Sequence, residues 1–210
     1  MMENLLRFQK NQKYLVFDFE TENLNLVIKN RPWQLSYLIC EGDRIIKESD
    51  NFIWWADLNV SKEAATITRF YYDKYKRLAK PAAQILNEFE SYLYNEEYLI
   101  IGQNLLNFDI YVHNIYRKEL GKKPDWSYTS RIIDTNALSK AFKLSSIVGD
   151  DRPSWMFKMN NYRKKGLKTS LSLMGKELEI PFDYESTHDG LQDVKLNFFV
   201  WNKLKWMVDI

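Results

Sequence analysis

Asp18 and Glu20 stand at the end of a short apolar and aromatic run, Tyr14–Phe19, in the order Asp-Phe-Glu-Thr. Alternate side chains of a strand share one face, so the two carboxylates are expected to point the same way. A carboxylate on a buried strand costs free energy unless it is paired or binds a metal ion. The alternative is that the strand ends at Asp18 and leaves two solvated acids in a loop.

Two further carboxylates lie far along the chain. Asp109 falls in the first turn of an expected helix, where the helix dipole favours a negative charge without any catalytic role. Asp193 follows His188 by five residues, a spacing that turns two side chains of one helix about 140° apart. The two can therefore converge only if His188 precedes the helix, and Asp189-Gly190 favours a helix boundary there.

The carboxylates at these four positions make a set of hard oxygen donors, and one imidazole lies nearby in the sequence. The chain has only two histidines, and His113 lies within an apolar helical pattern that is typical of a packing residue. The lack of cysteine or further histidine beside the acids disfavours zinc and suits magnesium or manganese. Two such ions about 3.5–4 Å apart can hold the attacking and leaving oxygens of a phosphodiester displacement.

These residues resemble the DEDD superfamily of exonucleases, in the DnaQ-like branch that carries a histidine in its third motif (DEDDh). Residues 18–24, Asp-Phe-Glu-Thr-Glu-Asn-Leu, are similar to the motif D-x-E-T-T-G-L. Residues 102–109 resemble G-H-N-x-x-x-F-D, and residues 188–193 match H-x-x-x-x-D. Asp134-Thr135 resembles a D-T pair between the second and third motifs. The motifs follow the family order over residues 14–193.

The resemblance implies an α/β, ribonuclease H-like fold: a five-stranded mixed sheet with helices on both faces, in a single exonuclease domain over residues 1–210. It implies a 3′→5′ exonuclease that releases nucleoside 5′-monophosphates with two divalent cations, Mg²⁺ or Mn²⁺. The implied ligands of these cations are Asp18, Glu20, Asp109 and Asp193. By the same resemblance, His188 deprotonates the attacking water.

The resemblance also implies contacts to the substrate. Leu24 is expected to wedge against the terminal base, and the backbone of Thr21 to contact the terminal sugar. Asn104 and Phe108 are the second-motif residues carried over as substrate-binding.

Three positions depart from the family pattern. Glu22 and Asn23 replace Thr-Gly; asparagine tolerates positive φ, so the turn can survive. Glu22 adds a negative charge close to where we expect a phosphate. Gln103 stands where many members have histidine, and it keeps hydrogen-bonding capacity without a positive charge.

Local patterns predict the elements that position these residues. The predicted strands are Tyr14–Phe19, Trp33–Cys40, Arg44–Trp54 and Glu97–Ile101, with a hairpin turn at residues 41–43. The predicted helices are Ser61–Phe70, Pro81–Tyr94, Phe108–Leu120, Asn136–Phe142, Leu171–Leu178 and Leu191–Val208. Residues 145–168 have the least regular pattern.

Composition sets broader limits. The 210 residues carry a net charge of +2, too mild to indicate nucleic acid by itself. The one cysteine, Cys40, excludes an internal disulfide framework and fits a reducing compartment. With no apolar run near the roughly 20 residues that span a bilayer and no signal-peptide core, we expect a cytoplasmic protein.

The expected partner is the single-stranded 3′ end of a nucleic acid, with DNA preferred. A basic cluster at residues 163–168 could follow phosphates or form a solvated loop. Two alternatives stay open: an RNA-trimming exonuclease of the same fold, and a non-catalytic nucleic-acid-binding or polymerase-associated module. The first motif begins so near the N-terminus that we expect a stand-alone nuclease, with a polymerase or replication partner left open.

Overall fold

The structure is a computed structural model, and it describes residues 5–26, 29–186 and 189–210. Six strands of this part form one mixed sheet in the order β4-β3-β2-β1-β5-β6. Their bounds are β1 Lys13–Thr21, β2 Pro32–Glu41, β3 Arg44–Trp54, β4 Lys80–Pro81, β5 Tyr98–Gly102 and β6 Ile132–Asp134. β2 runs antiparallel to β1 and β3, and the other neighbouring pairs are parallel.

The expectation of five strands was wrong by one strand. The additional strand is β4, which has only two residues and pairs with the end of β3. A two-residue strand that contains Pro81 has no period-2 pattern, so the sequence does not reveal it.

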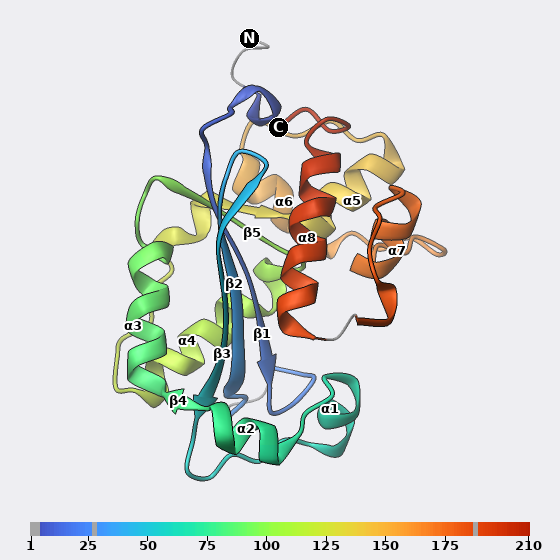
Figure 1. Cartoon of the computed structure of the whole chain (residues 1–210). Helices are drawn as coiled ribbons and strands as arrows, with labels where there is room; N and C mark the ends of the chain where they lie inside the picture. Colours follow the sequence, from blue (N-terminus) through green and yellow to red (C-terminus); the bar gives the residue numbers. More distant parts are fainter. Residues whose placement is uncertain (1–4, 27–28, 187–188) are drawn as a thin grey trace.

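Helices cover both faces of the sheet, as expected (Figure 1). The α-helices are α1 Lys62–Ile67, α2 Tyr72–Leu78, α3 Ala82–Leu93, α4 Asp109–Glu119, α5 Thr135–Leu144, α6 Arg152–Asn161, α7 Leu171–Glu177 and α8 Gly190–Leu204. Short 3₁₀ segments are η2 Leu6–Phe8, η3 Leu105–Asn107, η4 Ser127–Arg131 and η5 Tyr184–Ser186. α3 and α4 lie on one side of the sheet, and α5 to α8 lie on the other (Figure 1).

The alternation of β1 divides its side chains between the two helical layers. Tyr14 packs against Trp201 of α8 with ring centroids 5.7 Å apart. Phe17 packs against Phe89 of α3 at 5.1 Å. Asp18 lies four residues after Tyr14 and therefore shares the face that α8 covers.

Helices α2 and α6 were not predicted. Residues 61–70 were expected to form one helix, but α1 ends at Ile67 and Arg69 has a φ of 52°. In α6 only Met156 and Asn160 are buried, too few apolar positions for a helical period.

Two apolar clusters stabilise the described residues. The larger one fills both sides of the central strands. The smaller one consists of Trp33, Phe52 and Tyr75, with partly buried neighbours, and it holds α2 against β3. Tyr75 also links the two elements, because its hydroxyl donates to the carbonyl of Ile53 at 2.9 Å.

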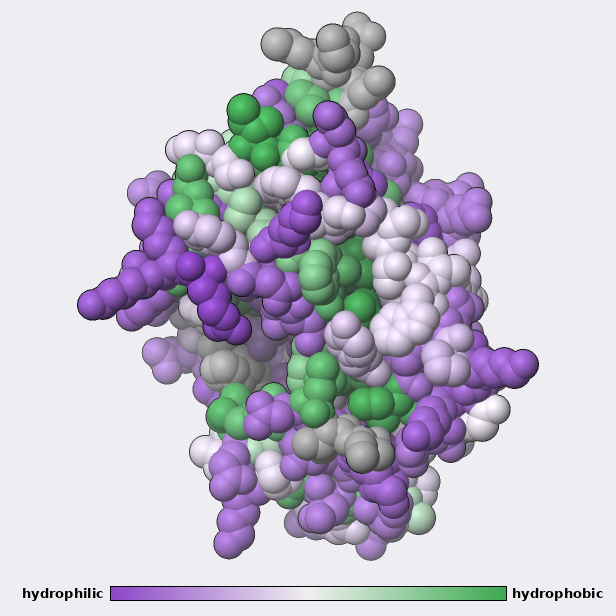
Figure 2. All heavy atoms as spheres, turned by 180° about the vertical axis from the view of Figure 1, so that it is seen from behind, coloured by the Kyte–Doolittle hydropathy of each residue, from purple (hydrophilic) through white to green (hydrophobic). Residues whose placement is uncertain are grey.

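The surface has no dominant apolar face in the view from behind. Hydrophilic residues prevail there, and hydrophobic ones form small separate patches (Figure 2). Among the described helices, none combines the length and hydropathy needed to cross a membrane.

Candidate active site

Asp18 and Glu20 lie on β1 on the face covered by α8. In the antiparallel register Asp18 is opposite Ser36 of β2, and Glu20 is opposite Gln34. The register shifts between Glu20 and Thr21, so the regular pairing ends just after the second acid. Both carboxylates therefore stand at the C-terminal end of a central strand, the end at which open α/β sheets bind ligands.

Asp109 joins the site from the start of α4. The residue is 2% exposed, and its Oδ1 accepts a hydrogen bond from the N–H of Phe19 at 3.1 Å. This bond ties the first residue of α4 to the β1 residue that lies between Asp18 and Glu20. It explains how residues about 90 positions apart in the chain come together.

Asp193 reaches the site from the first turn of α8. The helix begins at Gly190, and the carboxylate of its N-cap Asp189 accepts from the N–H of Gln192. An added Cβ on Gly190 would lie 2.7 Å from Oγ of Ser36, so the start of α8 lies directly on β2. The predicted helix boundary at Asp189-Gly190 is confirmed.

Electrostatic coupling shows that the four carboxylates are neighbours. Burial raises the pKa of Asp18 well above its usual range, and the charges of Asp109, Glu20 and Asp193 raise it further. Burial raises the pKa of Glu20 to about 8, and Asp193 and Asp109 add to the shift. Burial also raises the pKa of Asp109 to about 7, against the hydrogen bond from Phe19.

The structure thus brings together the four acids that the sequence singled out, from β1, α4 and α8. His188, the predicted base, lies outside the described residues. Strongly raised pKa values in neighbouring acids are typical of sites where a bound cation or a reaction uses the charges.

The donor set fits a hard divalent cation, because all four groups offer carboxylate oxygens. Yet no three Asp, Glu, His or Cys side chains within residues 5–26, 29–186 and 189–210 are arranged to hold a metal ion.

The loop after Glu20 is fixed by Glu22, one of the departures from the family pattern, and by Arg31 and Asn30, which sequence reasoning did not single out. Glu22 is buried, and its carboxylate accepts from Nε and Nη2 of Arg31 at 3.1 and 2.8 Å. The backbone N–H of Asn59 adds a further bond at 2.8 Å. The negative charge that Glu22 adds to this loop is thus paired with the guanidinium of Arg31.

Asn30 organises the same loop from inside. Its side chain is fully buried, accepts from the N–H of Asn23 at 2.8 Å and donates to the carbonyls of Asn23 and Asn25 at 3.0 Å. Asn23 is not among the residues with positive φ, so the turn persists through these bonds. Leu24, which the loop presents, is 44% exposed.

The second loop is anchored on Asp134, at the end of β6. Its fully buried carboxylate accepts from the N–H groups of Asn104 and Leu106 at 2.9 and 3.1 Å. Asn104 has a left-handed backbone, with φ 64°. Phe108 is partly buried against the core just before α4. An aspartate after the apolar pair 132–133, at a helix start, was the available signal for this anchor.

Gln103 and His113 have structural partners. Gln103 donates to the carbonyl of Thr169 at 2.8 Å and accepts from the hydroxyl of Thr135 at 2.8 Å. His113 is fully buried between the hydroxyl of Tyr128, at 3.0 Å, and a carboxylate oxygen of Glu90, at 3.2 Å. The prediction that His113 is a packing residue is confirmed.

Comparison with known proteins identifies solved structures that share this fold. No family model matches the chain, and no curated protein matches its sequence. Solved structures do match. E. coli exonuclease I in complex with a dA16 oligonucleotide has a TM-score of 0.73 and 17% sequence identity, over 93% of this chain and 41% of that one.

Two further exonuclease I structures give similar values. The zinc-bound complex of the E. coli enzyme with single-stranded DNA has a TM-score of 0.73 at 17% identity, covering 93% of this chain and 41% of that one. A product-bound structure of exonuclease I has a TM-score of 0.72 at 17% identity, covering 94% and 44%. The chain thus spans less than half the length of these proteins. It shares their ribonuclease H-like fold.

Proposed function

We propose that the chain is a metal-dependent 3′→5′ exonuclease of the DEDDh type, which hydrolyses terminal phosphodiesters of single-stranded nucleic acid to nucleoside 5′-monophosphates. The observation that carries the proposal is the gathering of four carboxylates, from β1, α4 and α8, at the C-terminal end of the central strand. The fold shared with exonuclease I supports the same reaction class. Neither support depends on a single motif.

The proposed roles follow from position. Asp18, Glu20, Asp109 and Asp193 would hold two divalent cations, Mg²⁺ or Mn²⁺, which when bound supply Lewis-acid stabilisation of the attacking and leaving oxygens. His188 takes the proton from the attacking water, a role suited to a group with an ordinary pKa near 6.5.

The substrate contacts proposed for the two loops remain consistent with their placement. Leu24 is exposed enough to contact a terminal base, and the backbone of Thr21 lies at the end of β1 beside Glu20. Asn104 and Phe108 flank the 3₁₀ turn that leads to Asp109. One loop thus continues from β1, which carries Asp18 and Glu20, and the other leads into α4, which begins with Asp109.

Single-stranded DNA is the proposed substrate. Exonuclease I structures with dA16 and dT13 oligonucleotides share this fold. A terminal base must leave its stack before its phosphodiester can enter such a site, which also favours single strands. RNA trimming, a polymerase partner and a cytoplasmic location stay predictions.

A direct test uses an oligonucleotide labelled at its 5′ end, incubated with the purified protein and Mg²⁺ or Mn²⁺. We expect a ladder of products that shorten from the 3′ end and that disappears when a chelator is added. Matched DNA and RNA strands compare the two substrates. Binding without shortening in either metal would contradict the enzyme and favour the non-catalytic module.

A further inference from the structure

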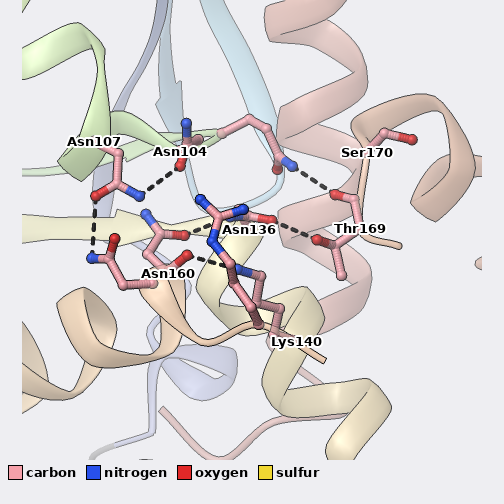
Figure 3. A pocket seen from close by; sticks show the side chains of 10 residues that line it. Asn104, Asn107, Asn136, Lys140, Asn160, Thr169 and Ser170 are labelled. Carbon is pink, nitrogen blue, oxygen red and sulfur yellow. Dashed lines mark hydrogen bonds between the residues drawn. The ribbon is translucent and has the colours of Figure 1, made fainter. Parts of the chain in front are cut away.

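A polar cavity of about 620 Å³ lies at the C-terminal ends of β5 and β6, bordered by α5, α6 and the loop before α7 (Figure 3). We call it the amide pocket. Its lining consists of six asparagine or glutamine amides, with Asn104, Asn136 and Asn160 among them, two hydroxyl groups, and the cationic side chains of Lys140 and Arg163. None of these ten residues is aromatic or aliphatic.

A chain of hydrogen bonds fixes the walls of the amide pocket. The buried carboxylate of Asp134 accepts from Nδ2 of Asn160 at 2.7 Å. Asn160 in turn accepts from Nδ2 of Asn136 at 2.7 Å, and Asn136 accepts from the hydroxyl of Thr169 at 2.6 Å (Figure 3). The side chains are therefore held in place before any ligand binds, which lowers the entropic cost of binding.

Two cationic groups face the same space. The ammonium of Lys140 donates to the carbonyls of Asn160 at 2.6 Å and Tyr162 at 3.1 Å, and so uses two of its three N–H bonds. Burial lowers the pKa of Lys140, and the nearby charge of Arg163 lowers it further. Arg163 makes no ion pair with any residue that the structure describes. Neighbouring like charges without a surface acid favour an anionic ligand.

The acid beneath the amide pocket, Asp134, acts on the pKa of Lys140 in the opposite direction, but less than burial and Arg163 do. Asp134 is fully buried, and its oxygens are occupied by N–H donors of residues 104, 106 and 136 and by Asn160. The N–H groups that remain available to a ligand therefore lie on the wall formed by Lys140 and Arg163.

The chemistry of the lining selects among the parts of a nucleic acid. A base would need an aromatic face for stacking, which this lining lacks, whereas a phosphate needs cations and N–H or O–H donors. Asn104 both lines the pocket and begins the loop that leads to Asp109, so the pocket is next to the candidate active site.

We propose that the amide pocket binds a backbone phosphate of the substrate strand, on the 5′ side of the bond that is cut. This inference rests on the proposed nuclease function and adds a binding subsite to it. Arg163 and Lys140 neutralise the phosphate, and the amide and hydroxyl groups orient it.

The test measures binding of a 5′-fluorescein single strand by anisotropy in a D18N background, which leaves the strand uncut. R163Q is expected to weaken binding about fivefold near 0.1 M salt and to reduce the slope of log K against log salt by about 0.7, the value for one contact to a single strand. R163K is expected to retain the charge and most of the affinity. K158Q is the matched control, because Lys158 is exposed and lies about 200° around α6 from Asn160.

Methylphosphonate substitution then identifies the phosphate. Each of the second to fifth phosphates from the 3′ end is replaced in turn by the uncharged group. We expect one replacement to weaken binding to the parent D18N protein and to have no further effect on R163Q. Equal effects in the two proteins at every position, or an R163Q slope equal to that of K158Q, would overturn the subsite.

The wild-type cleavage assay separates this failure from failure of the proposed function. Chelator-sensitive cleavage together with unchanged binding in R163Q overturns the amide pocket alone. A wild-type chain that neither binds nor shortens the strand overturns the nuclease proposal and, with it, this subsite.

Discussion

Asp18 is a residue on which burial and the charges of its neighbours act in the same direction. Burial and three neighbouring carboxylates, those of Asp109, Glu20 and Asp193, all raise its pKa. Such a cluster of charged acids lowers the stability of the fold unless a cation compensates it, and clusters of this kind are typical of functional sites. Under the proposed function the acids hold cations, whereas His188 moves a proton.

This division of roles predicts different losses of activity. H188A is expected to reduce the rate of 3′-end cleavage by about 10²–10⁴-fold, the usual contribution of a general base, and to keep slow metal-dependent cleavage. D18N is expected to lose nearly all cleavage. The measurement is single-turnover cleavage of a labelled strand.

D43N is a suitable control. Asp43 lies in the β2–β3 turn, away from the four acids, and pairs with Lys205 after α8. We expect it to cleave at the wild-type rate. Equal residual rates in D18N and H188A would refute the separate roles.

At the scale of elements, the sequence predicted those helix and strand bounds that hydrophobic periodicity and turn residues determine. The bounds of β3 agree at both ends, and the start of α8 agrees within one residue because Asp189-Gly190 marks it. The alternation of β1 placed Asp18 and Glu20 on one face. Local patterns of this kind depend on neighbours in the chain, so a single sequence reveals them.

The contacts that hold the loops could not be predicted in the same way. Asn30 and the Glu22–Arg31 pair act through partners from different turns, and Asp134 holds a loop 30 residues earlier in the chain. α6 is amphipathic to so small a degree that its pattern resembles a loop. Such features follow from tertiary packing, which periodicity does not encode.

The contact between α8 and β2 predicts the effect of one methyl group. In G190A the new Cβ would lie 2.7 Å from Oγ of Ser36, so the start of α8 must shift and move Asp193. We expect about 10–100-fold slower cleavage with the fold retained, since a displacement of about 1 Å can have this effect.

The double variant G190A/S36A supplies the control. Removal of the Ser36 hydroxyl opens the space, and we expect most of the lost rate to return. Circular dichroism and thermal melting check that both variants fold. A G190A protein with the wild-type rate would show that the position of α8 does not govern the site.

The ion network between α3 and α4 predicts how stability depends on pH. Burial raises the pKa of Glu90, but hydrogen bonds from His113, Lys122 and Arg117 outweigh it and hold the pKa at about 2. Because this value lies below the ordinary 4.5, the contribution of Glu90 to stability is complete above pH 4.5 and is lost as pH falls towards 2.

The variant E90Q should therefore be less stable than the wild type at pH 7, and the difference should narrow below pH 4.5. Burial lowers the pKa of His113, so the unfolded chain gains protons first below pH 6.5 and the stability of both proteins falls there. Urea unfolding at several pH values measures the free energies. A difference that stays constant from pH 7 to 3 would contradict the depressed pKa of Glu90.

At the scale of the whole molecule, acids from distant segments gather at one end of the sheet. The net charge of the whole chain is nevertheless +2. Exonuclease I chains share this fold over 93% of the present chain, although they are more than twice as long. The amide pocket and the two loops lie around the same end of the sheet.

The proposed function requires acids from β1, α4 and α8 to act as one metal site. Titration of Mn²⁺ into the protein, followed by calorimetry or by the electron paramagnetic resonance of the free ion, tests this directly. We predict two bound ions per wild-type chain, and loss of at least one in D18N, D109N and D193N alike. Unchanged binding in D193N, with loss in D18N, would show that α8 does not take part and would contradict the shared site.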